Sequence, residues 1–239
     1  MLRLDTLPRT PAVATILTAL LTIVSGTPAV AQSSFFVPFD DNLNATEAAG
    51  DGEVKSRLAS EVERVPGVSG RAAQLNGKGA LSYRAPQNLP RDAATVMFWL
   101  KPDFDTKTTN YIWRWRSRDD RDVRFWVGQN PTFYFDIVGA SDRQYGVSCQ
   151  FDRIDLDGWV HIAIGWANRP GSGQDEMRLW VNGSWKGRVR DASLVFSNMF
   201  SNFEMLDGGA VDSLRVVPGL LDTPDIQRWM NHHGPGASA

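Results

Sequence analysis

This sequence has a single cysteine, no excess of basic residues and no long apolar run. Its one cysteine, Cys149, excludes an intramolecular disulfide and any zinc site with more than one thiolate ligand. Lysine and arginine total 25 against 27 aspartates and glutamates, so no basic excess can neutralise the phosphates of a nucleic acid. The longest apolar run, residues 12–24, is shorter than the roughly 20 residues that cross a bilayer. The sequence therefore predicts neither a nucleic-acid partner nor a membrane span.

Glutamate is also scarce, which bears on catalysis by paired carboxylates. The glutamates are Glu47, Glu53, Glu61, Glu63, Glu176 and Glu204. A retaining glycosidase needs an acid and a nucleophile about 5 Å apart. Glu61 and Glu63 share one side of an extended segment, but they lie in a polar stretch where a solvated pair is expected. The sequence therefore argues against a retaining glycoside hydrolase, and no nucleophile-elbow motif supports serine catalysis.

The N-terminus has the pattern of an export signal. Arg3 and Arg9 precede the apolar run, and Ala29-Val30-Ala31 fits cleavage by signal peptidase after Ala31. The alternative is a buried N-terminal helix. Residues 1–31 are predicted to be a signal peptide, residues 32–232 one folded domain and residues 233–239 a flexible tail. The mature chain is expected to be secreted or periplasmic.

Period-two patterning dominates the rest of the chain and predicts a nearly all-β fold. The expected strands are residues 35–39, 80–84, 94–101, 110–116, 123–127, 132–138, 159–167, 177–181, 185–189 and 211–217. Asn182-Gly183 predicts a type I′ hairpin turn, and Thr223-Pro224-Asp225 predicts the start of a short helix that ends near Met230. The polar segment 42–70 is expected to be a long surface excursion. So many strands in one chain favour a two-layer sandwich.

Five short signatures resemble those of a known family. They are Phe39-Asp40, residues 70–77 (GRAAQLNG), residues 94–102 (ATVMFWLKP), residues 159–163 (WVHIA) with 179–183 (LWVNG), and residues 211–216 (VDSLRV). In this order they resemble the laminin G-like domains of the concanavalin A-like lectin and glucanase superfamily. The resemblance implies an all-β, two-sheet antiparallel jelly-roll sandwich whose curved front sheet, in relatives, often recognises glycans or proteins. It implies no catalysis by itself, because one fold supports many functions.

Aromatic residues are concentrated between residues 111 and 135, and strand parity divides them between two faces. The sets expected to face the core are Tyr111, Trp113 and Trp115; Val123, Phe125 and Val127; and Phe133, Phe135 and Ile137. The outward set is Arg114, Arg124, Trp126, Tyr134, Asp136, Arg178 and Trp180. Sugar rings stack on Trp and Tyr while their hydroxyls pair with Arg and Asp, so the outward set is the predicted carbohydrate-binding surface. The alternatives are a ligand-free amphipathic surface and a protein-binding surface.

The resemblance also implies a structural calcium site. Asp40 on the first strand and Asp212 on the last match positions at which family members often ligate Ca²⁺. Two carboxylates, with backbone carbonyls near Gly70, suit the oxygen coordination of this ion. The alternative is that both aspartates only accept backbone hydrogen bonds.

A polysaccharide lyase would need a His and a Tyr, with an Arg or Asn to neutralise the uronate carboxylate. His161, Tyr134 and Arg178 supply these residue types, but the usual Gln-x-His and Tyr-containing motifs are missing, so a hydrogen-bonded structural His161 is expected. The leading prediction is a secreted, non-enzymatic module that binds carbohydrate. A protein-binding adhesion or assembly module is the alternative, and a lyase or hydrolase ranks third. The expected partner is thus a glycan or an extracellular protein.

Overall fold

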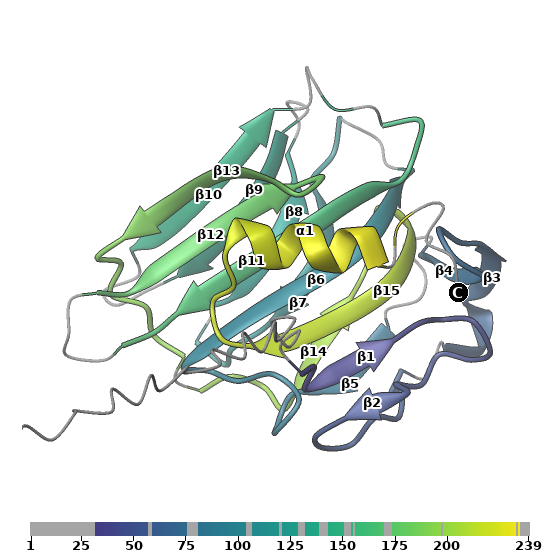
Figure 1. The fold of residues 1–239 in the computed structure, drawn as a ribbon. Coiled ribbons are helices and arrows are strands. Elements are labelled where there is room, and N and C mark those ends of the chain that lie inside the picture. Colours follow the sequence, from purple (N-terminus) through teal and green to yellow (C-terminus); the bar gives the residue numbers. More distant parts are fainter. Residues whose placement is uncertain are drawn as a thin grey trace, which may run out of the picture. The chain divides into compact units, whose positions relative to one another are not determined.

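Alternating apolar residues form strands throughout the domain, and these strands make two antiparallel sheets (Figure 1). The structure is a computed structural model that describes residues 32–56, 59–75, 81–103, 107–119, 121–128, 132–138, 143–150, 154, 156–169, 174–196, 198–232 and 234. The predicted signal peptide lies outside the described residues, as does the predicted tail apart from Gly234. The prediction of an all-β, two-sheet antiparallel sandwich with a short C-terminal helix is confirmed.

Within the described ranges, the larger sheet has nine strands and the smaller sheet has six. The nine-stranded sheet runs in the order β13 (Ser184–Arg190), β12 (Glu176–Val181), β11 (Val160–Ala167), β6 (Ala93–Pro102), β15 (Gly209–Pro218), β1 (Phe35–Val37) and β2 (Glu47–Ala48), with β4 (Arg71–Leu75) paired to β15 and β3 (Glu63–Pro66) paired to β4. The six-stranded sheet runs in the order β10 (Gln144–Gln150), β9 (Thr132–Val138), β8 (Val123–Val127), β7 (Asn110–Trp115), β14 (Asn202–Met205) and β5 (Leu81–Arg84). The first and last strands, β1 and β15, pair with each other.

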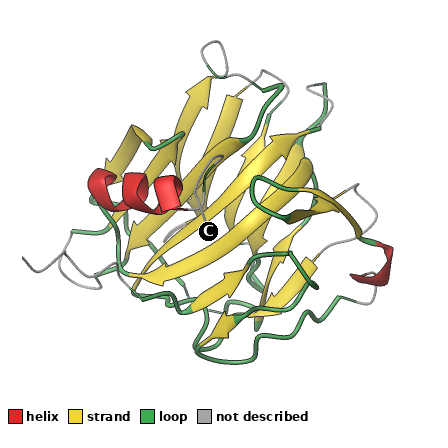
Figure 2. Ribbon diagram, turned by 45° about the vertical axis from the view of Figure 1, so that its right-hand side comes forward, coloured by secondary structure: helices red, strands yellow, loops and turns green. Residues whose placement is uncertain are grey.

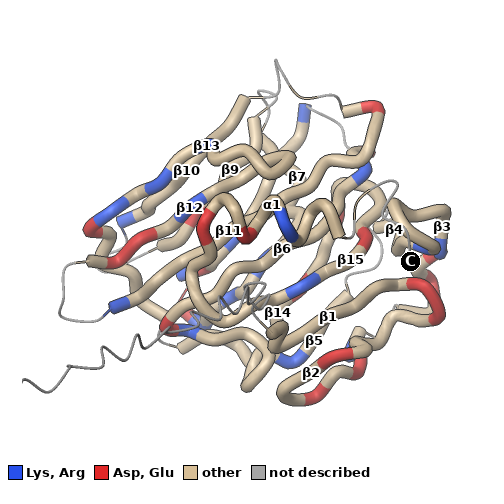
Figure 3. The backbone as a smooth tube through the Cα atoms, in the orientation of Figure 1, with Lys and Arg blue, Asp and Glu red and all other residues tan. Residues whose placement is uncertain are grey.

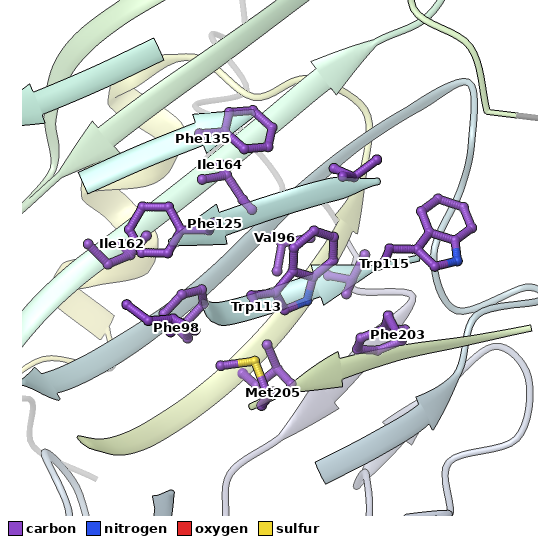
Figure 4. Close-up of a cluster of buried hydrophobic side chains, with 14 of the residues drawn as sticks. Val96, Phe98, Trp113, Trp115, Phe125, Phe135, Ile162, Ile164, Phe203 and Met205 are labelled. Carbon is purple, nitrogen blue, oxygen red and sulfur yellow. The ribbon is translucent and has the colours of Figure 1, made fainter. Parts of the chain in front are cut away.

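The core lies between the two sheets, where side chains from both layers meet (Figure 4). The ring of Phe98 on β6 lies 6.0 Å from that of Phe125 on β8, and the rings of Trp113 on β7 and Trp166 on β11 are 6.3 Å apart. All four side chains are fully buried. Period-two alternation therefore gives each sheet one apolar face toward the interior, as the sequence predicts.

Helix α1 (Thr223–His232) lies across the outer face of the nine-stranded sheet (Figures 1 and 2). Ile226 of this helix and Leu221 before it pack with Met97 and Ala163 in a second apolar cluster. The covering helix explains why β11 is buried on both faces. The predicted helix start at Thr223 is confirmed. Among the described residues, no helix has the length and apolar character needed to cross a bilayer.

The polar segment 42–70 contains more regular structure than the sequence predicts. It includes β2, the 3₁₀ turn η1 (Ala59–Glu61) and β3, and acidic residues recur along it (Figure 3). Strands β4, β10 and β14 are also absent from the predicted set. The predicted hairpin turn is confirmed, because Asn182 and Gly183 have φ angles of 50° and 67° between β12 and β13.

Candidate binding surface

Five of the seven predicted carbohydrate-binding residues lie together on the outer face of the six-stranded sheet. They are Arg114 on β7, Arg124 and Trp126 on β8, and Tyr134 and Asp136 on β9. The strand register places Arg124 opposite Asp136 and also opposite Arg114. It places Trp126 opposite Tyr134. The residues that alternate with them on β8 and β9 are buried in the core, so parity predicts this part of the surface correctly.

Tyr111 also belongs to this surface, and the prediction that it faces the core is wrong. A β-bulge lies between Tyr111 and Trp113, so that Ile112 and Trp113 are both fully buried and Tyr111 turns outward. Its ring centre then lies 5.1 Å from the guanidinium carbon of Arg114 and 5.9 Å from that of Arg124. Tyr111 and the five predicted residues above together form a surface that is called the aromatic–arginine patch. Its members are Tyr111, Arg114, Arg124, Trp126, Tyr134 and Asp136.

Trp126 is the centre of the aromatic–arginine patch. Its ring stacks on that of Tyr134, with centroids 4.3 Å apart and planes inclined by 15°, and lies 6.3 Å from the ring of Tyr111. The close approach depends on Gly128, where a Cβ atom would lie 2.8 Å from Cε2 of Tyr134. Trp126 and Tyr134 are half-buried, so part of each ring remains open to a ligand.

Asp136 fixes the side chains of Trp126 and Arg124 from below the surface. Its side chain is only 3% exposed, and its Oδ2 accepts hydrogen bonds from Trp126 Nε1 at 2.6 Å and from Gln144 Nε2 at 2.7 Å. The same oxygen lies 3.5 Å from Arg124 Nε. Burial raises the pKa of the Asp136 carboxyl, and the hydrogen bonds from Trp126 and Gln144 together with the charge of Arg124 offset part of this rise. Gly146 makes room for the carboxylate, because a Cβ there would lie 2.4 Å from Oδ1.

Asp122 holds Arg114 in the same manner, although the sequence prediction does not include it. This buried carboxylate accepts hydrogen bonds from Nε of Arg114 at 2.6 Å, from Nη2 of the same residue, and from the Ser117 amide at 3.0 Å. Asp122 directly precedes β8 and has the same parity as Arg124, which is the signal that could have identified it. Arg114 and Arg124 are opposite each other and would repel, but each has its own buried aspartate.

The patch therefore combines fixed ring faces with fixed guanidinium donors. The side chains of Arg114 and Arg124 remain 22% and 21% exposed, so both still reach solvent. Side chains that are already held in place lose little conformational freedom when a ligand binds. Chemically, such a surface can stack against an apolar ring face and donate hydrogen bonds to hydroxyl or carbonyl oxygens.

Arg178 and Trp180 are not part of this surface, and the prediction that they share it is wrong. Both lie on β12 of the other sheet. Both side chains lie on the outer face of that sheet, as strand parity predicts. Trp180 is nevertheless only 1% exposed, because α1 covers it. Its Nε1 donates a hydrogen bond to Thr223 Oγ1 at 3.0 Å. Arg178 donates from Nε to Glu176 and from Nη1 to the carbonyl of Leu221. Both residues thus connect the sheet to the helix and to the segment before it.

The three residues that a lyase would need are also separated. His161 on β11 is buried on the outer side of the nine-stranded sheet, where its ring lies 5.1 Å from that of Trp99. Tyr134 lies on the outer face of the six-stranded sheet, so the core separates it from His161 and Arg178. Glu61 and Glu63 are both exposed, as the sequence predicts for a solvated pair.

Asp40 and Asp212 meet at the turn between β3 and β4. Asp212 Oδ2 accepts hydrogen bonds from the amides of Val68 and Ser69, and Asp40 Oδ1 accepts one from the amide of Arg71. Burial raises the pKa of Asp212 to about 6, and the negative charge of Asp40 adds to this effect. Gly70 and Gly67 leave room for the two carboxylates to approach this turn. A Cβ atom on Gly70 would lie 1.9 Å from Asp40 Oδ1, and a Cβ atom on Gly67 would lie 2.5 Å from Asp212 Oδ2.

These contacts match the hydrogen-bonding alternative for the two aspartates, and they leave the calcium expectation untested. Within the described part of the chain, no group of three or more His, Cys, Asp or Glu side chains forms a candidate metal site. Any Ca²⁺ here would therefore need backbone carbonyls or water as its remaining ligands.

Solved structures of low sequence identity share this fold. The binding domain of botulinum neurotoxin DC in complex with SialylT has a TM-score of 0.66 at 13% identity, covering 83% of this chain and 50% of that one. The receptor-binding domain of the C/D mosaic serotype has a TM-score of 0.66 at 12% identity, with 82% and 50% covered. The serotype G binding domain has a TM-score of 0.64 at 10% identity, with 83% and 50% covered. This chain thus spans about half the length of these structures.

The family is identified by a sequence model rather than by these distant structures. No curated protein matches the sequence. A laminin G family model, described as the concanavalin A-like lectin/glucanases superfamily, matches residues 75–228, which is more than half of the chain. The matched residues include most strands of both sheets and most of α1. This chain belongs to the concanavalin A-like lectin/glucanases superfamily.

Proposed function

We propose that this chain is a secreted, non-enzymatic binding module that recognises carbohydrate through the aromatic–arginine patch. The observation that carries the proposal is the fixed geometry around Trp126, which stacks on Tyr134 while buried Asp136 holds its indole N–H. A sugar ring can cover the open part of this aromatic surface while the adjacent arginines bind its hydroxyls. The lectin-like family and the receptor-binding domains that share the fold support a binding role in general terms.

Two observations support the non-enzymatic part of the proposal. His161 and Tyr134 lie on opposite sides of the core, so they cannot act on one substrate as a lyase acid and base. Glu61 and Glu63 are exposed in and near η1, where solvent surrounds both carboxylates. Release of unsaturated or reducing sugar ends from a polysaccharide would contradict this part.

A glycan array tests the role of Trp126. The protein is expected to bind a subset of glycans saturably, and Trp126→Ala is expected to weaken that binding roughly 10- to 30-fold, or about 1.4–2 kcal/mol. Trp185→Ala is the matched control, because Trp185 is 51% exposed on β13 of the other sheet. This control should bind like the unaltered protein, and circular dichroism should show that both variants are folded.

The same experiment separates glycan binding from protein binding. Trp, Tyr and Arg also dominate protein interfaces, so the patch could serve an adhesion or assembly module. Capture of a defined protein partner, lost in Trp126→Ala and accompanied by no glycan signal, would favour that alternative. Glycan binding that is equally strong in Trp126→Ala and Trp185→Ala would overturn the assignment of the patch.

We also propose that residues 1–31 are removed during export, on the basis of their charged, apolar and small-residue pattern. N-terminal sequencing of the protein recovered from outside the cytoplasm is expected to begin at Gln32. An exported protein that retains the apolar run of residues 12–24 would contradict this proposal.

We further propose that Asp40 and Asp212 hold a structural Ca²⁺. The donor chemistry supports this, because two carboxylates are drawn together at one turn and the charge of Asp40 opposes ionisation of Asp212. A divalent cation with oxygen ligands would relieve that repulsion. Bound there, it would connect the segments after β1 and within β15 to the turn between β3 and β4.

A further inference from the structure

Phe200 separates two hollows at one end of the six-stranded sheet. It is 40% exposed, and among the described residues only Trp185 is another large apolar side chain with comparable exposure. The larger hollow, of about 610 Å³, is lined in part by Arg91, Asp92 and Arg118. The smaller hollow, of about 240 Å³, is lined in part by Arg116, Asn202 and Glu204. Since Phe200 and Ser201 line both, the two hollows together are called the Phe200 groove.

Most residues that line the groove lie in the segments beside β5, β7 and β14, but Phe200 is held firmly by neighbouring parts of the chain. Strands β5, β14 and β7 are antiparallel neighbours, so the ends of β5 and β7 meet the start of β14. The Phe200 amide donates to the carbonyl of Arg116 at 2.8 Å, and the Phe200 carbonyl accepts from Trp115 Nε1 at 2.9 Å. Met199 pairs with Ser117 in an isolated bridge. The backbone of Phe200 is thus fixed on both sides, and its ring is a preformed platform.

The arginines of the groove differ from those of the aromatic–arginine patch in their partners. Arg114 and Arg124 each face a buried aspartate. By contrast, Arg91, Arg116 and Arg118 form no ion pair within the described part of the chain. The guanidinium of Arg116 lies over the ring of Phe200, 6.0 Å from its centre. The groove therefore offers cationic donors that have no ion-pair partner among the described residues, beside an exposed ring.

Acceptors are also present in the groove. The carboxylates of Asp92 and Glu204 and the amide of Asn202 can accept hydrogen bonds from hydroxyl groups. A ligand that satisfies the whole groove needs a flat apolar face for Phe200, hydroxyl donors for these acceptors, and anionic groups for the arginines. A sugar that carries a carboxylate has all three features, whereas an acidic peptide lacks the repeated hydroxyls and a neutral sugar lacks the charge.

We propose that the Phe200 groove binds the carboxylated sugar units of an acidic glycan. This rests on the proposed glycan-binding function and names the class of glycan. The groove adjoins the aromatic–arginine patch, because Glu204 on β14 lies opposite Arg114 on β7. One glycan chain can therefore cross both, with ring stacking on Trp126 and its negative charges held beside Phe200.

Calorimetry with matched oligosaccharides tests the proposal. The probes are oligomers of galacturonate, glucuronate and mannuronate, each compared with its own carboxyl-reduced form, which keeps the sugar chain and loses the charge. At least one uronate oligomer is expected to bind about tenfold or more tightly than its reduced form. Arg116→Gln and Arg118→Gln are each expected to weaken that binding about tenfold and to remove most of the preference. Arg188→Gln, on exposed β13 of the other sheet, is the control and should change neither.

The outcomes distinguish this proposal from the broader function. One outcome is that neutral glycans bind, that Trp126→Ala abolishes this binding, and that no uronate binds better than its reduced form. This outcome would contradict acidic-glycan binding in the Phe200 groove and would still support glycan binding at the aromatic–arginine patch. Uronate binding that is lost in Arg118→Gln and unaffected by Trp126→Ala would support the groove and overturn the patch. Oligoglutamate that binds as tightly as the uronates would overturn the assignment to a sugar. Phe200→Ala provides a further variant, since its exposed ring can be removed with little effect on folding.

Discussion

Trp180→Ala is expected to lower the free energy of unfolding by about 3–5 kcal/mol and to leave glycan binding unchanged. Trp180 is 1% exposed and packs against Met97, Ala163 and Ile226 beneath α1. The substitution removes this buried indole and also the hydrogen bond from its Nε1 to Thr223 Oγ1 at the first residue of the helix. Because both losses occur where α1 meets the sheet, the helix should also exchange its amide protons faster. Urea denaturation and hydrogen exchange measure the two effects.

Trp185→Ala is the control for this prediction. Trp185 lies directly opposite Trp180 on the neighbouring strand but is 51% exposed. Its removal should change the free energy of unfolding by no more than about 0.5 kcal/mol, because exposed substitutions seldom cost more. A Trp180→Ala protein with unaltered stability and weakened glycan binding would contradict the structure and restore the assignment made from the sequence.

The titration of Asp212 is expected to lower stability as pH rises from about 4 to 6 in the presence of a chelator. The folded pKa is about 6, whereas the ordinary value is 3.8. In this window the folded state binds more protons than the unfolded state, so the free energy of unfolding falls with increasing pH. The two pKa values imply a total loss of about 3 kcal/mol, complete above pH 6.

The Asp212→Asn variant isolates this contribution. The amide oxygen can still accept from the amides of Val68 and Ser69, but it does not titrate. Asp136, whose pKa is also raised, remains in both proteins and cancels in the comparison. Denaturation curves measured at several pH values should show a larger fall in the unaltered protein than in the variant, by about 3 kcal/mol. Parallel pH profiles of the two proteins would contradict the raised pKa.

If Ca²⁺ binds between Asp40 and Asp212, it should reverse, at neutral pH, the decrease in the free energy of unfolding that ionisation of Asp212 causes. Excess Ca²⁺ is then expected to raise the melting temperature of the unaltered protein at pH 7, because a ligand that binds only the folded state stabilises it. The increase should vanish in Asp212→Asn. A melting temperature that is the same with calcium and with chelator would contradict the calcium proposal without affecting the prediction on pH.

Strand parity correctly placed most of the core and most of the aromatic–arginine patch. Phe125, Phe133 and Phe135 are buried, while the residues between them, Trp126 and Tyr134 among others, face outward. Alternation succeeds here because each strand is continuous and one face must be removed from water. The local turn chemistry of Asn182-Gly183 is equally direct, because both residues tolerate positive φ.

The errors arise where a second structural feature overrides alternation. The bulge after Tyr111 adds one residue, Ile112, to β7 without a partner on β8, and nothing in the alternating pattern marks where this insertion falls. Strand parity correctly places Trp180 on the outer face of its sheet, but a side chain on that face is also buried where a helix covers it. Which face α1 covers is a tertiary contact, so strand periodicity alone could not predict it. The sequence pattern does not predict β10, because Gly146 is a poor strand former and, with the polar residues on the outer side, interrupts the short apolar alternation of this strand.

Strand β13 ends the nine-stranded sheet, so in the described structure no strand pairs with one side of its backbone, although β10 of the other sheet lies close to it. Lys186, Arg188 and Arg190 recur at every second position along it and are all exposed. If a second copy of the chain approached to extend the sheet, two rows of like charge would come within a strand spacing of each other and repel. The row of cations thus discourages edge-to-edge aggregation.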